Sequence, residues 1–216
     1  MMRSFISPLR CPGCEIRKPL CFCDRIQSIE TRTRVVILMH TSEEVLTSNT
    51  AKLAAKALSN SEIRIHGRQH DRMSIAGLSQ LGQTSLLLFP SPHAIVLTNE
   101  FAESLSGPLN LIVPDASWRQ TTKFVRHEPC LAGLQHVKLA SGKPSEYFLR
   151  KQSSEQNLCT LEAIARALGV LDSNEVQRKL EVLLRVLVER TLWSRGLLKA
   201  SQCITAGIPT EALSGH

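Results

Sequence analysis

The sequence has no uninterrupted run of about 18 apolar residues, so it predicts no membrane-spanning helix. Its opening segment, MMRSFISPLRCPGC, lacks the apolar stretch of a signal peptide, and we therefore expect a cytoplasmic protein. No G-x-G-x-x-G loop is present, which argues against a Rossmann-type nucleotide site. The cysteines number seven, and an odd count in a chain without a signal peptide argues against a disulfide framework.

The chain carries an excess of positive charge. Its 26 Lys and Arg residues outnumber its 19 Asp and Glu residues, and the formal net charge is +7. The basic residues concentrate in residues 1–34 and 114–152. Such a balance favours an anionic partner, of which nucleic acid is the commonest, and a solvated basic surface is the alternative. With 43% apolar and 21% charged residues, the 216-residue chain fits one main globular domain with a small appendage.

Short apolar runs alternate with helical patterns along most of the chain. We expect strands at 34–40, 62–66, 86–89, 94–97, 109–113 and 136–139. We expect helices at 48–59, near 74–81, at 117–126, at 160–168 with Gly169 closing it, and from 174 to about 195. This order predicts an α/β fold with a mainly parallel sheet, in which ligands bind beyond the carboxyl ends of the strands. The residues after His40, Phe89 and Val113 are therefore the first places to look for a site.

Three regions differ in composition and indicate the domain organisation. Residues 1–33 hold a cysteine cluster and little apolar periodicity, residues 34–199 hold the α/β pattern, and residues 200–216 form a small, polar tail that we expect to be disordered.

Four cysteines lie within thirteen residues of the first region. Cys11-x2-Cys14 and Cys21-x-Cys23 offer four thiolates on one short loop, which matches tetrahedral Zn²⁺ ligation, and Pro12-Gly13 suits the tight turn of a zinc knuckle. Free or redox-active thiols and an iron–sulfur cluster are the alternatives. In zinc-finger peptides such binding is worth about 10–16 kcal/mol, enough to fold a segment too small for a core.

The stretch LNLIVPDASWRQTTKFVRH at 109–127 places polar groups directly after an apolar strand. Asp115 and Ser117 are both good helix N-cap residues, so one interpretation makes them caps and makes Trp118 a core anchor. The other interpretation places them in a site at the carboxyl end of the strand.

Here the sequence resembles the DTW-domain proteins. PDASWRQTTK at 114–123 is similar to their Asp-x-Thr-Trp signature with its following Gln and Lys, with Ser117 in place of Thr. Other pieces agree in order, namely the cysteine cluster, MHTSE at 39–43, NTAKL at 49–53, FPS at 89–91, SEYFLRK at 145–151 and LCTLEA at 158–163. Together these motifs span about residues 10–195.

The resemblance implies a tRNA-uridine aminocarboxypropyltransferase. Such an enzyme moves the 3-amino-3-carboxypropyl group of S-adenosylmethionine to N3 of a uridine, in bacterial members the variable-loop uridine, and releases 5′-methylthioadenosine. The resemblance also implies a SPOUT-like fold with a C-terminal trefoil knot, which general topology rules would not predict. Two rival functions are an S-adenosylmethionine-dependent RNA methyltransferase and a non-catalytic zinc-knuckle RNA-binding module.

The resemblance also assigns candidate roles to residues. Asp115, with Ser117 and Trp118, is the catalytic candidate, because a buried carboxylate beside the base can take the N3 proton. The candidates for cofactor binding are Phe89, Pro90, Arg150, Leu158, Thr160 and Glu162, and those for nucleic-acid binding are His40, Glu43, Asn49, Arg119, Lys123 and Arg126. The expected partner is tRNA, and we expect no membrane and no obligate protein partner.

Overall fold

The computed structural model describes residues 9–68, 77–78, 82–149 and 158–214. Its centre is a six-stranded sheet in the order β2-β1-β5-β3-β6-β4, and every neighbouring pair is parallel. The strands are β1 (Arg34–His40), β2 (Ser61–His66), β3 (Thr84–Leu88), β4 (Ile95–Leu97), β5 (Leu109–Asp115) and β6 (Gln135–Leu139). This confirms the expected α/β class and the parallel sheet.

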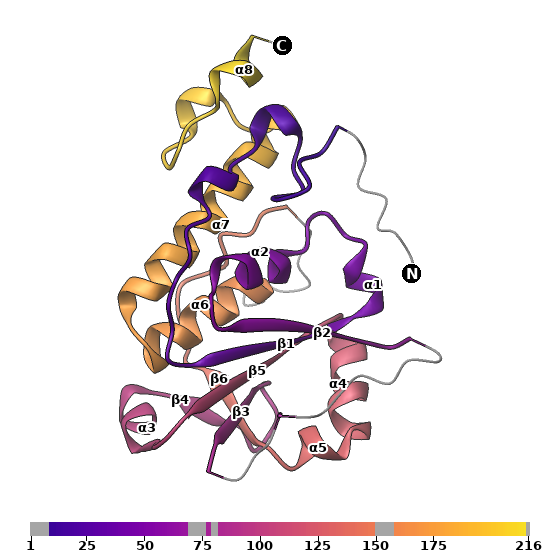
Figure 1. The fold of residues 1–216 in the computed structure, drawn as a ribbon, viewed down its shortest axis with the longest axis vertical. Helices are drawn as coiled ribbons and strands as arrows, with labels where there is room; N and C mark the ends of the chain where they lie inside the picture. The colour runs from indigo at the N-terminus through magenta and orange to yellow at the C-terminus, as the bar shows by residue number, and fades with distance from the viewer. Residues whose placement is uncertain (1–8, 69–76, 79–81, 150–157, 215–216) are drawn as a thin grey trace.

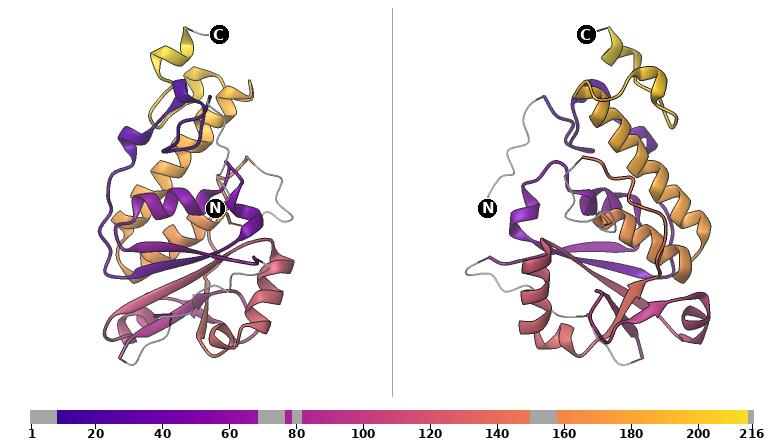
Figure 2. Two further views of the ribbon diagram at one scale, coloured as in Figure 1. Left: turned by 45° about the vertical axis from the view of Figure 1, so that its right-hand side comes forward. Right: turned by 180° about the vertical axis from the view of Figure 1, so that it is seen from behind.

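Helices cover both faces of the sheet (Figures 1 and 2). The helices α2 (Thr50–Ala57), α6 (Thr160–Leu171) and α7 (Asn174–Ser194) lie on one side, and α4 (Trp118–His127) and α5 (Pro129–Ala132) lie on the other. Side chains alternate along a strand, so Val35, Ile37 and Met39 of β1 join the larger core under α2, α6 and α7. Val36 and Leu38 join the smaller core under α4 and α5. Burial on both faces explains why β1 is an unbroken apolar run.

Short helices connect these elements. Among the described residues they are η1 (Lys18–Leu20), η2 (Cys23–Arg25), α1 (Thr41–Glu44), α3 (Asn99–Ser104), η3 (Ala200–Gln202) and α8 (Thr210–Leu213). At three to six residues they carry too little periodicity to be predicted from sequence. The helix expected near 74–81 falls mostly outside the described residues.

Two expectations at the back of the chain are wrong, one about Gly169 and one about the polar tail. Cys159 precedes α6, and Gly169, which we expected to close this helix, lies inside it because the helix continues to Leu171. A Cβ at Gly169 would clash with the Gln177 side chain of α7, so this glycine serves the close packing of two helices rather than ending one.

The polar tail is ordered through residue 214. The buried Glu189 carboxylate of α7 accepts hydrogen bonds from the backbone N–H groups of Ile204 (3.0 Å) and Thr205 (3.2 Å). A polar segment is disordered where no contact holds its backbone, and here the hydrogen bonds to Glu189 hold the backbone of the tail. The expectation of a disordered tail is therefore wrong for residues 200–214.

Candidate active site

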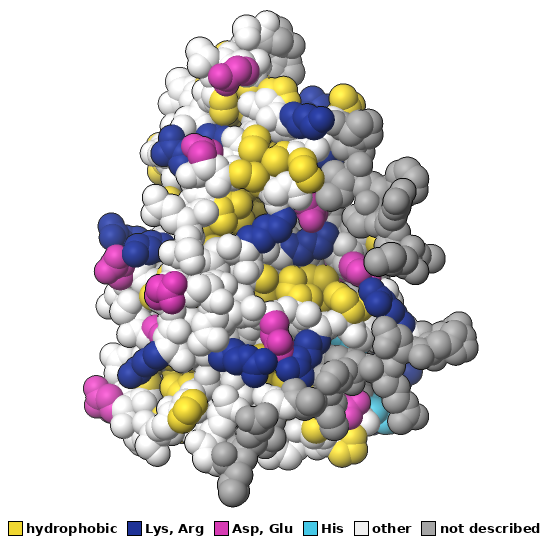
Figure 3. Space-filling view, viewed as in Figure 1, with side chains coloured by type: hydrophobic (Ala, Val, Ile, Leu, Met, Phe, Trp, Pro, Cys, Tyr) yellow, Lys and Arg dark blue, Asp and Glu magenta, His cyan; other side chains and the backbone are white. Residues whose placement is uncertain are grey.

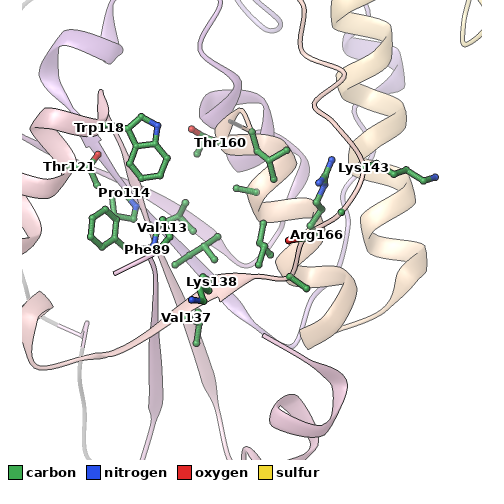
Figure 4. A pocket seen from close by; sticks show the side chains of 18 of the residues that line it. Phe89, Val113, Pro114, Trp118, Thr121, Val137, Lys138, Lys143, Thr160 and Arg166 are labelled. Atoms are coloured by element: carbon green, nitrogen blue, oxygen red, sulfur yellow. The ribbon is translucent and has the colours of Figure 1, made fainter. Parts of the chain in front are cut away.

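A cavity of about 690 Å³ opens at the carboxyl ends of β3, β5 and β6. This is the edge at which an open parallel sheet binds its ligands, and the volume lies within the range of small-molecule sites. Five of the predicted residues line it, namely Phe89, Pro90, Trp118, Leu158 and Thr160. Figure 4 shows Phe89, Pro114 and Trp118 together at one side of the cavity and Arg166 and Lys143 at the other.

Three cationic side chains also line the cavity, from Lys138, Lys143 and Arg166, and no Asp or Glu is among its described lining residues. Arg166 lies on α6 and donates a hydrogen bond to the Pro144 carbonyl at 3.2 Å. Sequence reasoning assigned none of the three to the site. Lys138 and Lys143 fall in the basic stretch 114–152, whereas Arg166 sits within a helix pattern that gave no signal.

Asp115 lies behind the cavity wall and is 6% exposed. Its Oδ1 accepts a hydrogen bond from the Thr160 hydroxyl (2.5 Å), and its Oδ2 accepts one from the Asn49 side-chain amide (2.7 Å). Thr160 itself lines the cavity, so this residue connects the carboxylate to the wall of the space where a ligand would lie. The same Asn49 amide also donates to Glu43 Oε2 (3.3 Å). Asp115 caps no helix, which excludes the capping interpretation for this residue.

Ser117 is the N-cap of α4. Its hydroxyl accepts a hydrogen bond from the Gln120 backbone N–H, and Gln120 Oε1 accepts one from the Ser117 backbone N–H, which forms a capping box. Gln120 Nε2 lies 3.2 Å from His40 Nδ1, and the Ser42 backbone N–H donates to the same nitrogen. Because two N–H donors face Nδ1, this nitrogen acts as their hydrogen-bond acceptor.

His66 packs beside His40 at the ends of β1 and β2. Its ring stacks on Phe124 of α4 with centroids 3.7 Å apart and planes 9° apart, and it meets the His40 ring edge-on at 5.2 Å. Burial, and secondly the charge of His40, lower the pKa of His66 to about 4. His66 is therefore neutral at physiological pH and serves as a packing surface.

Trp118 is 51% exposed, so the interpretation as a core anchor is wrong. The centroid of its ring lies 6.3 Å from the centroid of the Phe89 ring, at the mouth of the cavity. Arg119, Lys123 and Arg126 are exposed on the same helix, at a spacing that places them along one face.

Other predicted residues serve the scaffold or fall outside the structure. Asn49 is buried and caps α2 by accepting from the Lys52 N–H. Glu162 is 3% exposed and accepts hydrogen bonds from Ser145 Oγ (2.6 Å), the Glu146 N–H (2.7 Å) and the Cys159 N–H (2.9 Å). It therefore ties the segment after β6 to the start of α6. Arg150 lies outside the described residues.

The four cysteines of the first region converge. Their sulfur atoms all lie within 4.8 Å of one another, with separations of 3.3 Å for Cys11–Cys21, 3.5 Å for Cys11–Cys23 and 3.8 Å for Cys14–Cys21. A Cβ at Gly13 would clash with Cys23 Sγ, so the turn accepts only glycine there. A hydrogen bond from the Cys14 backbone N–H is the main cause that lowers the pKa of Cys11 to about 6, which favours a thiolate.

The cysteine segment is held against α7 by a buried arginine. Arg190 donates through Nη1 to the carbonyls of Leu20 (2.9 Å) and Cys21 (2.6 Å). No helix in the described part of the chain is both long and apolar enough to cross a membrane.

The parallel sheet, with a mixed apolar and cationic cavity beyond its carboxyl edge, defines an α/β ligand-binding protein of the kind that hosts enzyme sites. Within that class, the chain belongs to the DTW domain family, whose model matches residues 8–192.

Curated relatives align along most of the chain. One is "tRNA-uridine aminocarboxypropyltransferase A" of Arabidopsis thaliana, 31% identical over 209 residues, which cover 82% of this chain and 79% of the relative. Another is "tRNA-uridine aminocarboxypropyltransferase 2" of Drosophila melanogaster, 28% identical over 176 residues, which cover 79% of this chain and 69% of the relative. Among solved structures, the SAM-dependent rRNA:acp-transferase Tsr3 from Vulcanisaeta distributa matches with a TM-score of 0.49 and 18% identity, covering 84% of this chain and 89% of that one.

Proposed function

We propose that this protein transfers the 3-amino-3-carboxypropyl group of S-adenosylmethionine to N3 of a tRNA uridine and releases 5′-methylthioadenosine. The observation that carries this proposal is that relatives from a plant and an insect, aligned along 79–82% of the chain, are both named tRNA-uridine aminocarboxypropyltransferase. The cavity and the polar cluster behind it supply chemistry that suits this reaction.

The cavity fits S-adenosylmethionine in size and in chemistry. Phe89, Pro90 and Trp118 offer apolar and aromatic surface for an adenosine, and the faces of the two aromatic rings attract a sulfonium cation. Lys138 and Arg166 offer cationic groups for the methionine carboxylate. When bound, the donor supplies an electrophilic carbon next to a good leaving group, so the chain's main task is to position the acceptor base.

Uridine N3 carries a weakly acidic proton that must leave before N3 can attack carbon. We assign its removal to Asp115 acting through Thr160. The Thr160 hydroxyl donates to Asp115 Oδ1 and lines the cavity, so its oxygen can accept the N3 proton while its own proton passes to the carboxylate. Asn49 acts here as a positioning residue, because its amide donates to the second oxygen of Asp115, and Glu43 acts through Asn49 by accepting from the same amide.

The exposed face around the cavity is the proposed contact for tRNA. The Trp118 ring, half exposed at the cavity mouth, suits stacking on a base, and Arg119, Lys123 and Arg126 on α4 suit backbone phosphates. His40, at the end of β1, is a further proposed contact for the same RNA. The variable loop as target and the C-terminal knot stay predictions from the family resemblance.

We propose that the cysteine cluster binds a structural Zn²⁺. Four thiolates at Zn–S distances of about 2.3 Å in a tetrahedron lie roughly 3.8 Å apart, close to the sulfur separations observed. Such a site would stabilise the segment around η1 and η2, from which Cys14, Ile16, Leu20 and Phe22 join the larger core. The bound metal would thus hold Arg10 and Arg17, which pair across an antiparallel bridge, on a rigid surface.

The decisive experiment uses unmodified tRNA and S-adenosylmethionine labelled separately in its methyl and carboxyl groups. Carboxyl label in tRNA, with methyl label leaving as methylthioadenosine, is the expected result. Methyl label in tRNA would identify a methyltransferase instead. Binding of tRNA without cofactor binding, together with an Asp115→Asn variant that behaves as wild type, would identify a non-catalytic RNA-binding module.

A further inference from the structure

A second hollow, of about 200 Å³, lies between the cysteine segment and the end of α7. We call it the arginine pocket, because Arg10, Arg17 and Arg195 all line it. The described lining residues include several hydroxyl side chains, among them Thr47 and Ser48, and no Asp or Glu. The residues proposed above for the reaction and for zinc binding do not include these three arginines.

The charges around the arginine pocket favour an anion. The last turn of α7 ends at Ser194 and contributes roughly half a negative charge, which three guanidinium groups outweigh several-fold. The acidic residue nearest in sequence to Arg17, Glu15, forms an ion pair with Lys52 at 3.1 Å. Figure 3 shows Lys and Arg side chains, in dark blue, between the cysteine segment and α2 on the face seen there.

Hydrogen bonds to backbone orient two of the guanidinium groups. Arg10 donates through Nη1 to the Glu15 carbonyl (2.8 Å), and Arg195 donates through Nη1 to the Leu149 carbonyl (3.2 Å). Each guanidinium has five N–H donors in a fixed plane, so one such bond leaves further donors to face the pocket. Planar, oriented donors of this kind match the oxygens of a phosphate group.

The arginine pocket and the candidate active site share a loop. Ser48 lines the pocket, and its neighbour Asn49 holds Asp115 Oδ2. The Tyr147 hydroxyl donates to the Ser48 carbonyl at 2.7 Å and ties the chain after β6 to this loop. The two sites therefore meet at Ser48 and Asn49, so an RNA strand whose base enters the candidate active site can extend across this loop toward the pocket.

We propose that the arginine pocket binds a backbone phosphate of the tRNA at a nucleotide flanking the one that is modified. The proposal rests on the proposed function in that it takes tRNA as the substrate. It extends the RNA contact from α4 across the loop to the cysteine segment and α7. S-adenosylmethionine has no phosphate, so the pocket suits the RNA and not the cofactor.

The test compares Arg17→Gln and Arg195→Gln with Arg178→Gln, an exposed arginine on α7 that does not line the pocket. The measurement is the Kd for unmodified tRNA as a function of salt. Loss of one phosphate contact lowers the slope of log K against log salt by about 0.9. Between about 50 and about 200 mM salt, the wild-type Kd should therefore rise roughly 3.5-fold more than that of either pocket variant. Arg178→Gln should keep the wild-type slope.

Further measurements separate this proposal from folding and from catalysis. Arg17→Lys keeps the charge and should restore most of the salt slope, and the Kd for S-adenosylmethionine should stay unchanged in every variant. Equal slopes for all folded variants would overturn the proposal. If wild-type protein binds tRNA but transfers no label, the proposed activity fails, and the salt slopes still decide the arginine pocket.

Discussion

Replacement of Asp115 by Asn tests the central assignment because it keeps the shape of the side chain and removes its charge. Both oxygens of the buried carboxylate accept hydrogen bonds, from Thr160 and from Asn49. An amide offers one accepting oxygen, so its NH2 group must face one of these two donors. Asn49 has no simple way to rotate, because its own oxygen caps α2 by accepting from Lys52. The NH2 group therefore faces the Thr160 hydroxyl, which can accept from it but whose own proton loses its acceptor.

The expected cost to stability follows from that single unmatched donor. A buried polar group left unsatisfied costs about 1–3 kcal/mol. For a chain of this length, each kcal/mol lowers the Tm by roughly 2–4 °C, so Asp115→Asn should melt about 2–12 °C below wild type. The protein should still fold, because a loss of about 1–3 kcal/mol is smaller than the roughly 5–15 kcal/mol by which native proteins are stable.

The expected loss of activity is larger than the loss of stability. Removal of a general base costs about 10²- to 10⁴-fold in rate. The rate of label transfer to tRNA at saturating substrate measures this loss, and the Kd for tRNA should remain close to wild type. A folded variant that transfers at the wild-type rate would refute proton removal by Asp115.

A second pair of variants tests the route through Thr160. Thr160→Ser keeps the hydroxyl and should retain most activity, whereas Thr160→Val removes it and should approach the loss seen for Asp115→Asn. If Thr160→Val transfers as fast as Thr160→Ser, the carboxylate does not act through this hydroxyl, and Asp115 would be a positioning residue only.

Three further perturbations follow from the site. Trp118→Ala should weaken tRNA binding about 5- to 150-fold, since stacking on a base is worth about 1–3 kcal/mol, and should leave the Tm unchanged because the ring is half exposed; an unchanged Kd would contradict stacking. Removal of metal by a chelator should increase amide hydrogen exchange in residues 11–25 while β1 stays protected, and equal exchange before and after would exclude a structural metal. His66 has a pKa of about 4 in the folded state and about 6.5 in the unfolded state. Between pH 4 and pH 6.5 the unfolded chain therefore binds a proton on this residue that the folded protein does not bind. Stability should therefore be complete above pH 6.5 and fall by on the order of 3 kcal/mol as the pH drops to 4, and urea unfolding of His66→Gln should show a flatter profile.

Most of the sheet was predictable from sequence, because β1 and β5 are short apolar runs and β2 alternates apolar with polar residues. β1 and β2 begin within one residue of their expected starts, and β5 extends two residues further, to Asp115. Burial on both faces leaves an unbroken hydrophobic signature that local reasoning can find. The strand order and the two cores were not predictable, because they depend on which runs pair across long separations in the chain.

Part of the cavity lining could be named from the sequence, but its arrangement could not. Phe89, Trp118 and Thr160 were expected near the carboxyl ends of strands and line the cavity there, and their roles stay predictions. Arg166 could not be identified, because an arginine in a helix pattern looks like any solvated charge. Glu162 was expected near a ligand, and the structure shows that it anchors the segment after β6. This contact joins groups 16 and 17 residues apart, which spacing alone does not specify.

Asn49 shows why the carboxylate of Asp115, the catalytic candidate, stands behind the cavity wall rather than in it. Its oxygen caps α2, and its amide joins Glu43 to Asp115, so one buried side chain fixes a helix start and the catalytic candidate together. The hydrogen bond to Asp115 joins residues 66 positions apart, and the bond from Thr160 joins residues 45 positions apart. Because Asp115 is held by hydrogen bonds from both sides, its carboxylate cannot move toward the substrate. The Thr160 hydroxyl at the cavity wall already donates to this carboxylate, so Asp115 can act through it without moving. The same loop that ends at Asn49 borders the arginine pocket, so a phosphate bound there would place RNA against the backbone that positions Asp115.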